Sequence, residues 1–274
     1  MYLKVYFILV LIIFLFFTII NKKKNKKIIF TCSTFFDFKD NVRWEKFNKT
    51  IETLQYHHSP ETLSKIDKWV IVNEYSENHN QNWEKLMKEK YPDMIFIQKK
   101  ENEKGQAYSL NMILKEIKNY DYWIHWEETW QVRYPFLEKA FSIMNNNNSI
   151  TQLQFTFHNG CVNWLNVEKE RIHCYNNPYE YCIIDGPSDN SFMNYDPYNL
   201  PNSAFDLWPL YSLLPSINRV KFYNKLGEFS EDPKLWPLKF EWDYARRWYS
   251  NGGKKAVLKD GPVYRPDKHM STYE

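Results

Sequence analysis

Two hydrophobic patterns alternate along the 274 residues of the chain. Short apolar runs of β-type residues predict strands at 28–34, 68–73, 94–98, 122–126, 150–157 and 256–260. Apolar positions at helical spacing predict helices at 44–56, 82–90, 106–117, 134–144, 218–226 and 240–250. Residues 160–215 are rich in Asn, Asp, Tyr and Pro and predict loops. Because strands and helices alternate, we expect an α/β fold with a mostly parallel sheet and helices on both faces.

The chain opens with an almost entirely apolar run at residues 1–20. A helix of this length spans about 30 Å, the thickness of the hydrocarbon core of a bilayer. No small-residue cleavage site follows the run, which favours a retained anchor over a cleaved signal peptide. We therefore expect a transmembrane anchor at 1–21, a basic juxtamembrane segment at 22–27 and one folded domain at 28–274.

The sequence leaves open which side of the membrane the folded domain occupies. The lysines of residues 22–27 outweigh Lys4 on the other side of the apolar run, and this bias favours a cytosolic domain. Two glycosylation triplets, which begin at Asn48 and Asn147, would be used only in a lumen. We expect a single-pass membrane protein of undecided orientation.

Composition excludes several function classes. The net charge is only +3, and much of the excess lies in residues 22–27, so there is no broad basic face and no nucleic-acid partner is expected. Seven glycines form neither a G-x-x-x-x-G-K-[ST] nor a G-x-G-x-x-G motif, which argues against P-loop and dinucleotide chemistry.

The four cysteines include no C-x-x-C pair that would indicate a zinc ribbon. Cys161, Cys174 and Cys182 lie close in sequence, and two of them could pair in an oxidising lumen. The alternative is the commoner state of a buried free cysteine.

Polar groups follow each of the first four predicted strands. In open α/β sheets, ligands bind beyond the carboxyl ends of the strands, so these groups are candidates for one site. The candidates are Ser33 and Thr34 after the first strand, Glu74 and Ser76 after the second, Lys104, Gly105 and Asn111 after the third, and His125, Glu127 and Glu128 after the fourth.

The acidic pair Glu127–Glu128 follows an aromatic strand and is flanked by Trp126 and Trp130. Its oxygens could coordinate Mg²⁺ or Mn²⁺ bridging two phosphates, because these hard cations prefer oxygen ligands. The alternative is a charged pair that starts the next loop.

Two later segments add charged candidates. Glu241, at the start of the helix 240–250, could act as a general base toward a hydroxyl, and Asp243 could serve the helix N-terminus. The alternative is an ordinary charged first turn. In the last loop His269 could complete a metal shell, and either Arg265 or Lys268 could hold phosphate, although a lone histidine there is more often simply exposed.

Together these features resemble the GT-A glycosyltransferases, in particular the inverting family 2, over residues 27–270. The matching features are small polar residues after the first strand, Thr31–Thr34; an acid after the second, Glu74 with Ser76; a K-G-x-x-x-x-x-N segment, Lys104, Gly105 and Asn111; a D-x-D-type region, His125–Trp130; an E-D-type helix start, Glu241 and Asp243 with Arg246 and Arg247; and a late histidine, His269.

The resemblance implies a role for each matching residue. Donor-binding residues would be Thr31, Ser33, Thr34, Glu74, Ser76, Gly105, Asn111, Trp126 and Glu127. Catalytic residues would be Glu241, as the base, and Asp243; metal ligands for Mn²⁺ or Mg²⁺ would be Glu127, Glu128 and His269. The chain departs from the pattern at Thr129, where the last acid of the D-x-D motif would fall, so either Glu128 substitutes or metal binding is weak or absent.

The function implied by the resemblance is inverting transfer of a sugar from a nucleotide-diphospho-sugar to a hydroxyl of a glycan, lipid or protein, beside a membrane held by the N-terminal helix. A degenerate, non-catalytic GT-A domain that binds nucleotides or glycans is the first alternative. A membrane-tethered scaffold for protein contacts is the second.

Overall fold

The computed structural model describes residues 26–36, 42–77, 82–156, 172–175, 181–186, 194–199, 210–235 and 239–266. The predicted anchor at 1–21, most of the basic segment 22–27 and His269 lie outside these ranges. Within them, no helix is both long enough and apolar enough to cross a membrane.

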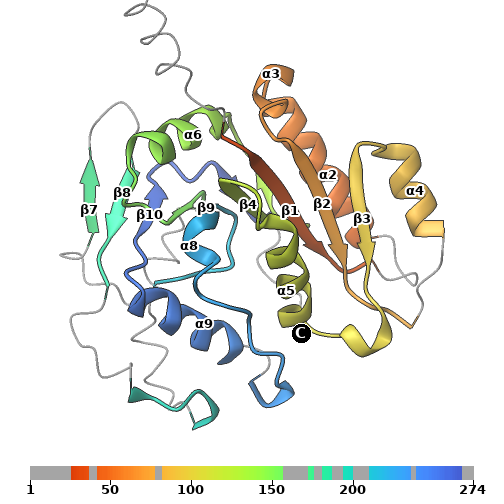
Figure 1. Cartoon of the computed structure of the whole chain (residues 1–274). Coiled ribbons are helices and arrows are strands. Elements are labelled where there is room, and N and C mark those ends of the chain that lie inside the picture. Colours follow the sequence, from red (N-terminus) through yellow and green to blue (C-terminus); the bar gives the residue numbers. More distant parts are fainter. Residues whose placement is uncertain are drawn as a thin grey trace, which may run out of the picture.

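A nine-stranded sheet organises the described chain (Figure 1). Its strands are β1 (Ile28–Thr34), β2 (Lys68–Asn73), β3 (Met94–Gln98), β4 (Tyr122–Glu127), β6 (Gln152–Gln154), β7 (Ile172–Tyr175), β8 (Tyr181–Ile184), β9 (Ser216–Arg219) and β10 (Lys255–Leu258). They are ordered β3-β2-β1-β4-β9-β6-β10-β8-β7. The first four run parallel, whereas β9 is antiparallel to both β4 and β6. A separate two-stranded sheet pairs β5 (Gln131–Val132) with β11 (Val263–Tyr264).

Helices cover both faces of the large sheet, as the sequence pattern predicts. Side chains of α2 (Val42–His57), α4 (Asn82–Lys90) and α6 (Leu137–Asn146) pack into one core cluster. Those of α5 (Gln106–Ile117), α8 (Val220–Tyr223) and α9 (Lys239–Ser250) pack into a second cluster on the opposite face. The remaining short elements are α3 (Pro60–Leu63) and the 3₁₀ helices η1 (Glu101–Glu103), η4 (Pro197–Asn199) and η6 (Pro233–Leu235).

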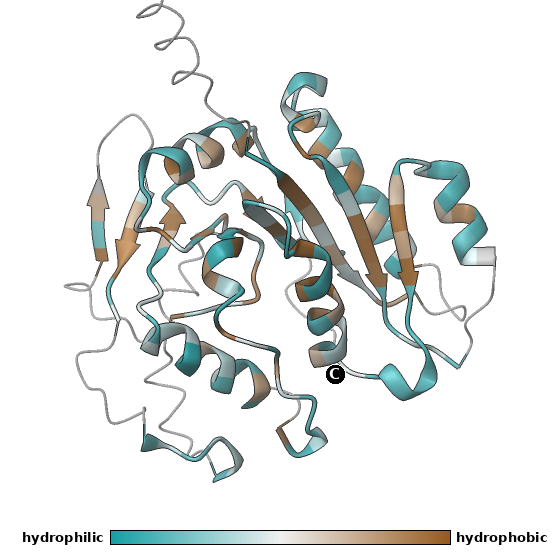
Figure 2. Cartoon of the chain, viewed as in Figure 1, coloured by the Kyte–Doolittle hydropathy of each residue, from teal (hydrophilic) through white to brown (hydrophobic). Residues whose placement is uncertain are grey.

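The central strands are apolar on both sides because both faces are covered. In β1, Phe30 belongs to the first cluster and its neighbour Ile29 to the second. In β4, Ile124 belongs to the first cluster and its neighbour Trp123 to the second. Figure 2 shows these strands as hydrophobic and the outer helices as largely hydrophilic. This two-sided burial is why the strands read as continuous apolar runs in the sequence.

The prediction differs from the structure between residues 216 and 226. We predicted a helix at 218–226, but β9 occupies Ser216–Arg219 and only Val220–Tyr223 is helical. Ile217, Val220 and Tyr223 are spaced as in a helix. Ile217 is nevertheless part of a strand, because it pairs with Ile124 of β4 and Leu153 of β6. Tertiary pairing therefore overrides the local pattern.

The outer edge of the sheet is a hairpin of β7 and β8, inside a region predicted to be loops. A disulfide joins Cys174 and Cys182 across it. The sequence left that pairing open, and Cys161, the third candidate, lies outside the described residues. Among the described cysteines, Cys32 is free and buried.

Candidate functional site

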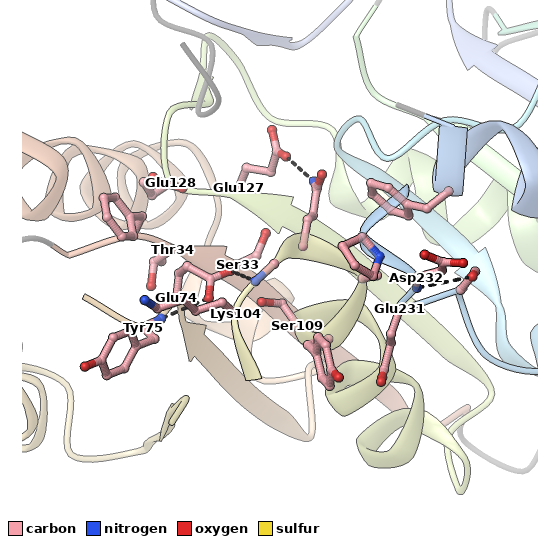
Figure 3. Close-up of a pocket in the computed structure, with 18 residues that line it drawn as sticks. Ser33, Thr34, Glu74, Tyr75, Lys104, Ser109, Glu127, Glu128, Glu231 and Asp232 are labelled. Atoms are coloured by element: carbon pink, nitrogen blue, oxygen red, sulfur yellow. Dashed lines mark hydrogen bonds between the residues drawn. The ribbon is translucent and has the colours of Figure 1, made fainter. Parts of the chain in front are cut away.

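The sheet edge at which β1, β2 and β4 end opens into a cavity of about 410 Å³. Its walls are the ends of these strands, the first turn of α5, the loop 230–233 and Phe240 of α9. Figure 3 shows Glu74 and Tyr75 at one end of the cavity, Glu231 and Asp232 at the other, and Glu127 and Glu128 along a third side. The sequence predicted a site at this edge.

Glu74 is the best-anchored acid of the cavity. Its carboxylate pairs with Lys99 at 2.7 Å and accepts the backbone N–H of Gly105 at 3.2 Å. The side chain of Lys99 is fully buried and also donates to the Gly105 carbonyl at 2.7 Å and to the Ser109 hydroxyl at 3.0 Å. Burial lowers the pKa of Lys99, and the charge of Glu74 opposes that shift. Glu74 and Lys99 together fix the loop that starts α5.

Gly105 is required at the start of α5 by its backbone conformation. Its φ is 106°, a value that residues with a Cβ rarely adopt. The sequence analysis missed Lys99, although a signal was present. Asn73 and Gln98 are register partners in β2 and β3, so the residues that follow them, Glu74 and Lys99, lie side by side.

The ends of β1 and β2 are tied together by buried polar side chains. The Thr34 hydroxyl donates to Asn73 Oδ1 at 3.0 Å, and Asn73 Nδ2 donates to Gln98 Oε1 at 2.7 Å. Ser33 lies beside Thr34 on the cavity wall and is half-buried. These contacts hold the strand ends in line and leave the Ser33 hydroxyl facing the site.

Four of the nine predicted donor-binding residues do not line the cavity. Thr31 accepts a hydrogen bond from Trp123 Nε1 at 2.7 Å inside the core. Trp126 is fully buried and donates to the Trp130 carbonyl at 3.2 Å. Ser76 is also buried away from the wall. The fourth, Asn111, acts on the cavity indirectly.

Asn111 holds the loop that forms the far wall of the cavity. Its Oδ1 accepts the Phe229 N–H at 2.8 Å, and its Nδ2 donates to the Phe229 carbonyl at 3.0 Å and to Glu231 at 2.7 Å. The Tyr198 hydroxyl fastens the same loop through Asp232 at 2.9 Å. The polar cavity residues Glu231 and Asp232 were not predicted from the sequence.

The pair Glu127–Glu128 lines the cavity as predicted, and each carboxylate already has partners. Glu128 is buried and pairs with Arg43 of α2 at 2.6 Å. Glu127 accepts from Trp130 Nε1 at 3.2 Å and lies 3.8 Å from an Arg265 nitrogen. Burial and the neighbouring Glu128 charge raise the pKa of Glu127, while Arg265 opposes that shift.

Thr129, where the resemblance implies the last acid of a D-x-D motif, contacts the guanidinium of Arg265. Arg265 Nε and Nη2 both donate to the Thr129 hydroxyl, at 3.1 and 3.0 Å. Within the described ranges, no three His, Cys, Asp or Glu side chains form a group that could hold a metal ion. His269, the third predicted metal ligand, lies outside the described residues.

Glu241 of α9 follows the wall residue Phe240, does not itself line the cavity, and is half-buried. Burial raises its pKa to about 7, and the nearby charge of Glu127 adds to the shift. The Leu213 backbone N–H donates to Glu241 Oε1 at 3.0 Å, which opposes the shift and fixes the side chain. A carboxyl with a pKa near neutrality is suited to take up a proton.

His125 and Asp243 have different surroundings from Glu241. His125 is buried in β4 and burial lowers its pKa to about 4, so the ring is neutral at pH 7. Asp243 does not line the cavity and pairs with Arg246 at 3.2 Å and Arg247 at 3.1 Å. Since Arg247 also donates to the Leu226 carbonyl at 2.7 Å, this cluster fastens α9 to the preceding loop.

The chain is similar in structure to several solved proteins. TarS residues 1–349 of S. aureus match with a TM-score of 0.54 and 14% identity over 87% of this chain and 59% of that one. GalNAc-T7 with UDP, GalNAc and Mn²⁺ matches with a TM-score of 0.54 and 13% identity over 89% and 45%. The mannosyltransferase PcManGT of Pyrobaculum calidifontis, in complex with GDP-Man and Mn²⁺, matches with a TM-score of 0.53 and 12% identity over 90% and 59%.

No protein-family model matches the chain, and no curated protein matches it in sequence. The chain spans less than two thirds of each of these three solved structures. At such low identity the likeness establishes the fold and leaves the substrate open. The parallel strands, the helices on both faces and the cavity at the strand ends agree with it, and the chain has the GT-A fold.

Proposed function

We propose that the chain is a glycosyltransferase that moves a sugar from a nucleoside diphospho-sugar to an acceptor hydroxyl, with inversion at the anomeric carbon. One observation carries the proposal: the cavity at the carboxyl ends of the parallel strands is lined by Phe240, and the next residue of α9, Glu241, is a carboxyl whose pKa is about 7. The ligands named for two of the similar structures, UDP and GDP-Man, are of the proposed kind.

The donor would lie along the cavity with its nucleoside at the Glu74 end. Tyr75 offers an aromatic surface there, and the Lys104 ammonium lies 4.7 Å from the centre of its ring. The Ser33 hydroxyl and the N-terminus of α5 suit the diphosphate, because helix N-termini favour anions. The sugar would then point toward Phe240 and Glu241.

In the proposed step, the acceptor oxygen attacks the anomeric carbon as the bond from that carbon to the β-phosphate oxygen breaks. The hydroxyl proton passes to Glu241, and the electron pair of the broken bond leaves with the nucleoside diphosphate. Attack opposite the leaving group inverts the configuration. In this scheme Asp243 positions α9 through its two arginines and takes no part in the proton transfer.

A thermal-shift screen of nucleoside diphosphates and their sugars tests donor binding. A ligand that binds only the folded state raises the Tm by mass action, so at least one nucleotide should raise it. If no nucleotide changes the Tm, the proposal is wrong. The alternative of a membrane-tethered scaffold for protein contacts then explains the chain better.

One observation favours the alternative of a non-catalytic domain. Thr129 replaces the last acid of the motif, and Glu128 is committed to Arg43. Such a domain would bind a nucleotide sugar without consuming it. Measuring sugar transfer, and not only binding, therefore separates the two functions.

We also propose that the folded domain lies in an oxidising lumen, held by the anchor predicted at residues 1–21. The Cys174–Cys182 disulfide supports this side, because disulfides persist in oxidising compartments and are rare in the cytosol. The lysines of residues 22–27 favour the opposite orientation.

A further inference from the structure

Arg265 contacts Thr129, the position at which the resemblance to GT-A glycosyltransferases implies a metal-binding acid, and it lies next to Glu127 of the cavity wall without lining the cavity itself. The residue after the acidic pair is Thr129, whose hydroxyl accepts hydrogen bonds from Arg265 Nε and Nη2 at 3.1 and 3.0 Å. A threonine hydroxyl contributes no negative charge to a cation site, unlike the acid it replaces. The position that would bind a metal ion in a D-x-D motif here binds a guanidinium instead.

The charges of the acidic pair are already balanced by arginines. Glu128 pairs with Arg43 at 2.6 Å, and Glu127 lies 3.8 Å from Arg265. A divalent cation bound to both carboxylates would compete with both guanidiniums. The donor set of the described residues therefore fits two arginines better than it fits a metal ion.

Arg265 is both held in place and partly open to solvent. Its guanidinium lies over the Trp130 ring at 5.2 Å, while 25% of the side chain is exposed. Its Nη1 has no hydrogen-bond partner among the described residues. A guanidinium fixed on one edge and free on another can donate to phosphate oxygens in a defined geometry.

We propose that Arg265 supplies the positive charge that binds the donor diphosphate, in place of a metal ion ligated at position 129. The inference rests on the proposed glycosyltransferase function. As the sugar–phosphate bond breaks, the electron pair goes to the β-phosphate oxygen, and Arg265 stabilises that oxygen by hydrogen bonds and charge. Arginine keeps its proton throughout, so it acts as a fixed charge and not as an acid.

Calorimetric titration of the full chain in detergent with UDP and with GDP tests this proposal, once in EDTA and once in Mn²⁺. We expect one nucleotide to bind in EDTA, with an affinity that Mn²⁺ changes little. Arg265→Gln should weaken that binding by about ten- to a hundredfold, the usual range for losing a charged hydrogen bond. Arg265→Lys should restore part of the loss.

Two further variants control for folding and for net charge. Thr129→Val removes the hydroxyl that holds Arg265 but keeps the side-chain shape, and it should weaken binding in EDTA by a smaller factor. Arg133→Gln removes one charge from the neighbouring β5–β11 sheet, where Arg133 is exposed and stacks on Tyr264 at 4.2 Å. It should bind like the wild type.

The possible outcomes separate the two claims. Binding that requires Mn²⁺, or that is unchanged in Arg265→Gln, overturns the inference and leaves the proposed function intact. If Arg265→Gln does not fold, unchanged binding by Thr129→Val overturns the inference by itself. If neither UDP nor GDP binds in EDTA or in Mn²⁺, the inference fails, and if no other nucleoside diphosphate raises the Tm either, the proposed function fails with it.

Discussion

Three glutamates near the cavity have the same chemistry and different surroundings. Glu128 is neutralised by Arg43, and Glu127 is partly balanced by Arg265. Glu241 has no arginine partner among the described residues, and burial raises its pKa to about 7. At the residue scale, Glu241 is thus the carboxyl best suited to exchange a proton near neutral pH.

We expect Glu241→Gln to abolish transfer, to leave nucleotide binding intact and to stabilise the protein at alkaline pH. The folded state holds the Glu241 proton more tightly than the unfolded chain, whose pKa is near 4.5, so wild-type stability falls as the pH rises from about 4.5 through about 7. Glutamine stays neutral and avoids this loss, a gain on the order of 1–3 kcal/mol at pH 8. Urea unfolding of both proteins at pH 5 and pH 8 measures it. Equal stability differences at the two pH values would show that the Glu241 pKa is not raised.

The same pKa sets the pH dependence of the reaction. Glu241 must be deprotonated to act as a base, so the rate should rise with pH through about 7 and then level off. Initial rates at saturating donor between about pH 5.5 and about pH 8.5 measure this profile. A rate that is flat over this range would rule out Glu241 as the base.

At the scale of elements, the cavity depends on a loop fastened from α5. Asn111 makes three hydrogen bonds to the segment Phe229–Glu231, which begins the far wall. This is a positioning role, because Asn111 does not line the cavity itself.

We expect Asn111→Ala to weaken nucleotide binding by about three- to tenfold and to lower stability by about 1–3 kcal/mol, because buried polar groups of the loop lose their partner. Nucleotide titration and thermal unfolding measure the two effects. Asn224→Ala is the matched control, since Asn224 makes one exposed hydrogen bond, to Lys118 at 3.4 Å. If Asn111→Ala changes the Tm but not the affinity, the loop does not shape the site.

Sequence patterns predicted elements well where burial is two-sided. β1 to β4 lie within one residue of their predicted bounds. A short continuous apolar run bounded by polar residues is typical of a strand that is buried on both faces. The short strands β7 and β8 were missed in a polar, aromatic region, where no period-2 pattern stands out. The helix predicted at 218–226 failed because pairing with β4 and β6 decides the structure of Ser216–Arg219.

The site was predictable only in part, for a related reason. Glu127 and Glu74 follow predicted strands. Because the carboxyl ends of parallel strands lie at the same edge of a sheet, both residues were expected at that edge. The contacts of Arg43 with Glu128 and of Arg265 with Thr129 join residues 85 and 136 positions apart. No local pattern encodes such contacts, and they are what changes the expected chemistry of the acidic pair.

At the scale of the whole molecule, the disulfide is the feature on which the proposed lumenal location rests. Cys174 and Cys182 close the β7–β8 hairpin, and their sulfurs are bonded. Since the opposing orientation signals in the sequence do not decide the side of the membrane, this bond is the structural feature that favours a lumen.

We expect protein isolated from its native membrane to yield a Cys174–Cys182 peptide pair by non-reducing mass spectrometry. Cys174→Ser should cost about 2–3 kcal/mol of stability, the entropic value for a short loop. Cys32, which is free and buried, serves as the internal reference and should be alkylated only after unfolding. Alkylation of both Cys174 and Cys182 without reduction would contradict the lumenal proposal.

The central claim is that the cavity binds a nucleoside diphospho-sugar and that Glu241 drives transfer of the sugar. The most direct measurement incubates the full chain with a panel of such donors and candidate acceptors, and follows nucleoside diphosphate release and the anomeric configuration of the product by NMR. We expect one donor to be consumed with inversion by the wild type and by Glu101→Gln, an exposed control, but not by Glu241→Gln. Undiminished turnover by Glu241→Gln, or retention of configuration in the product, would contradict the account.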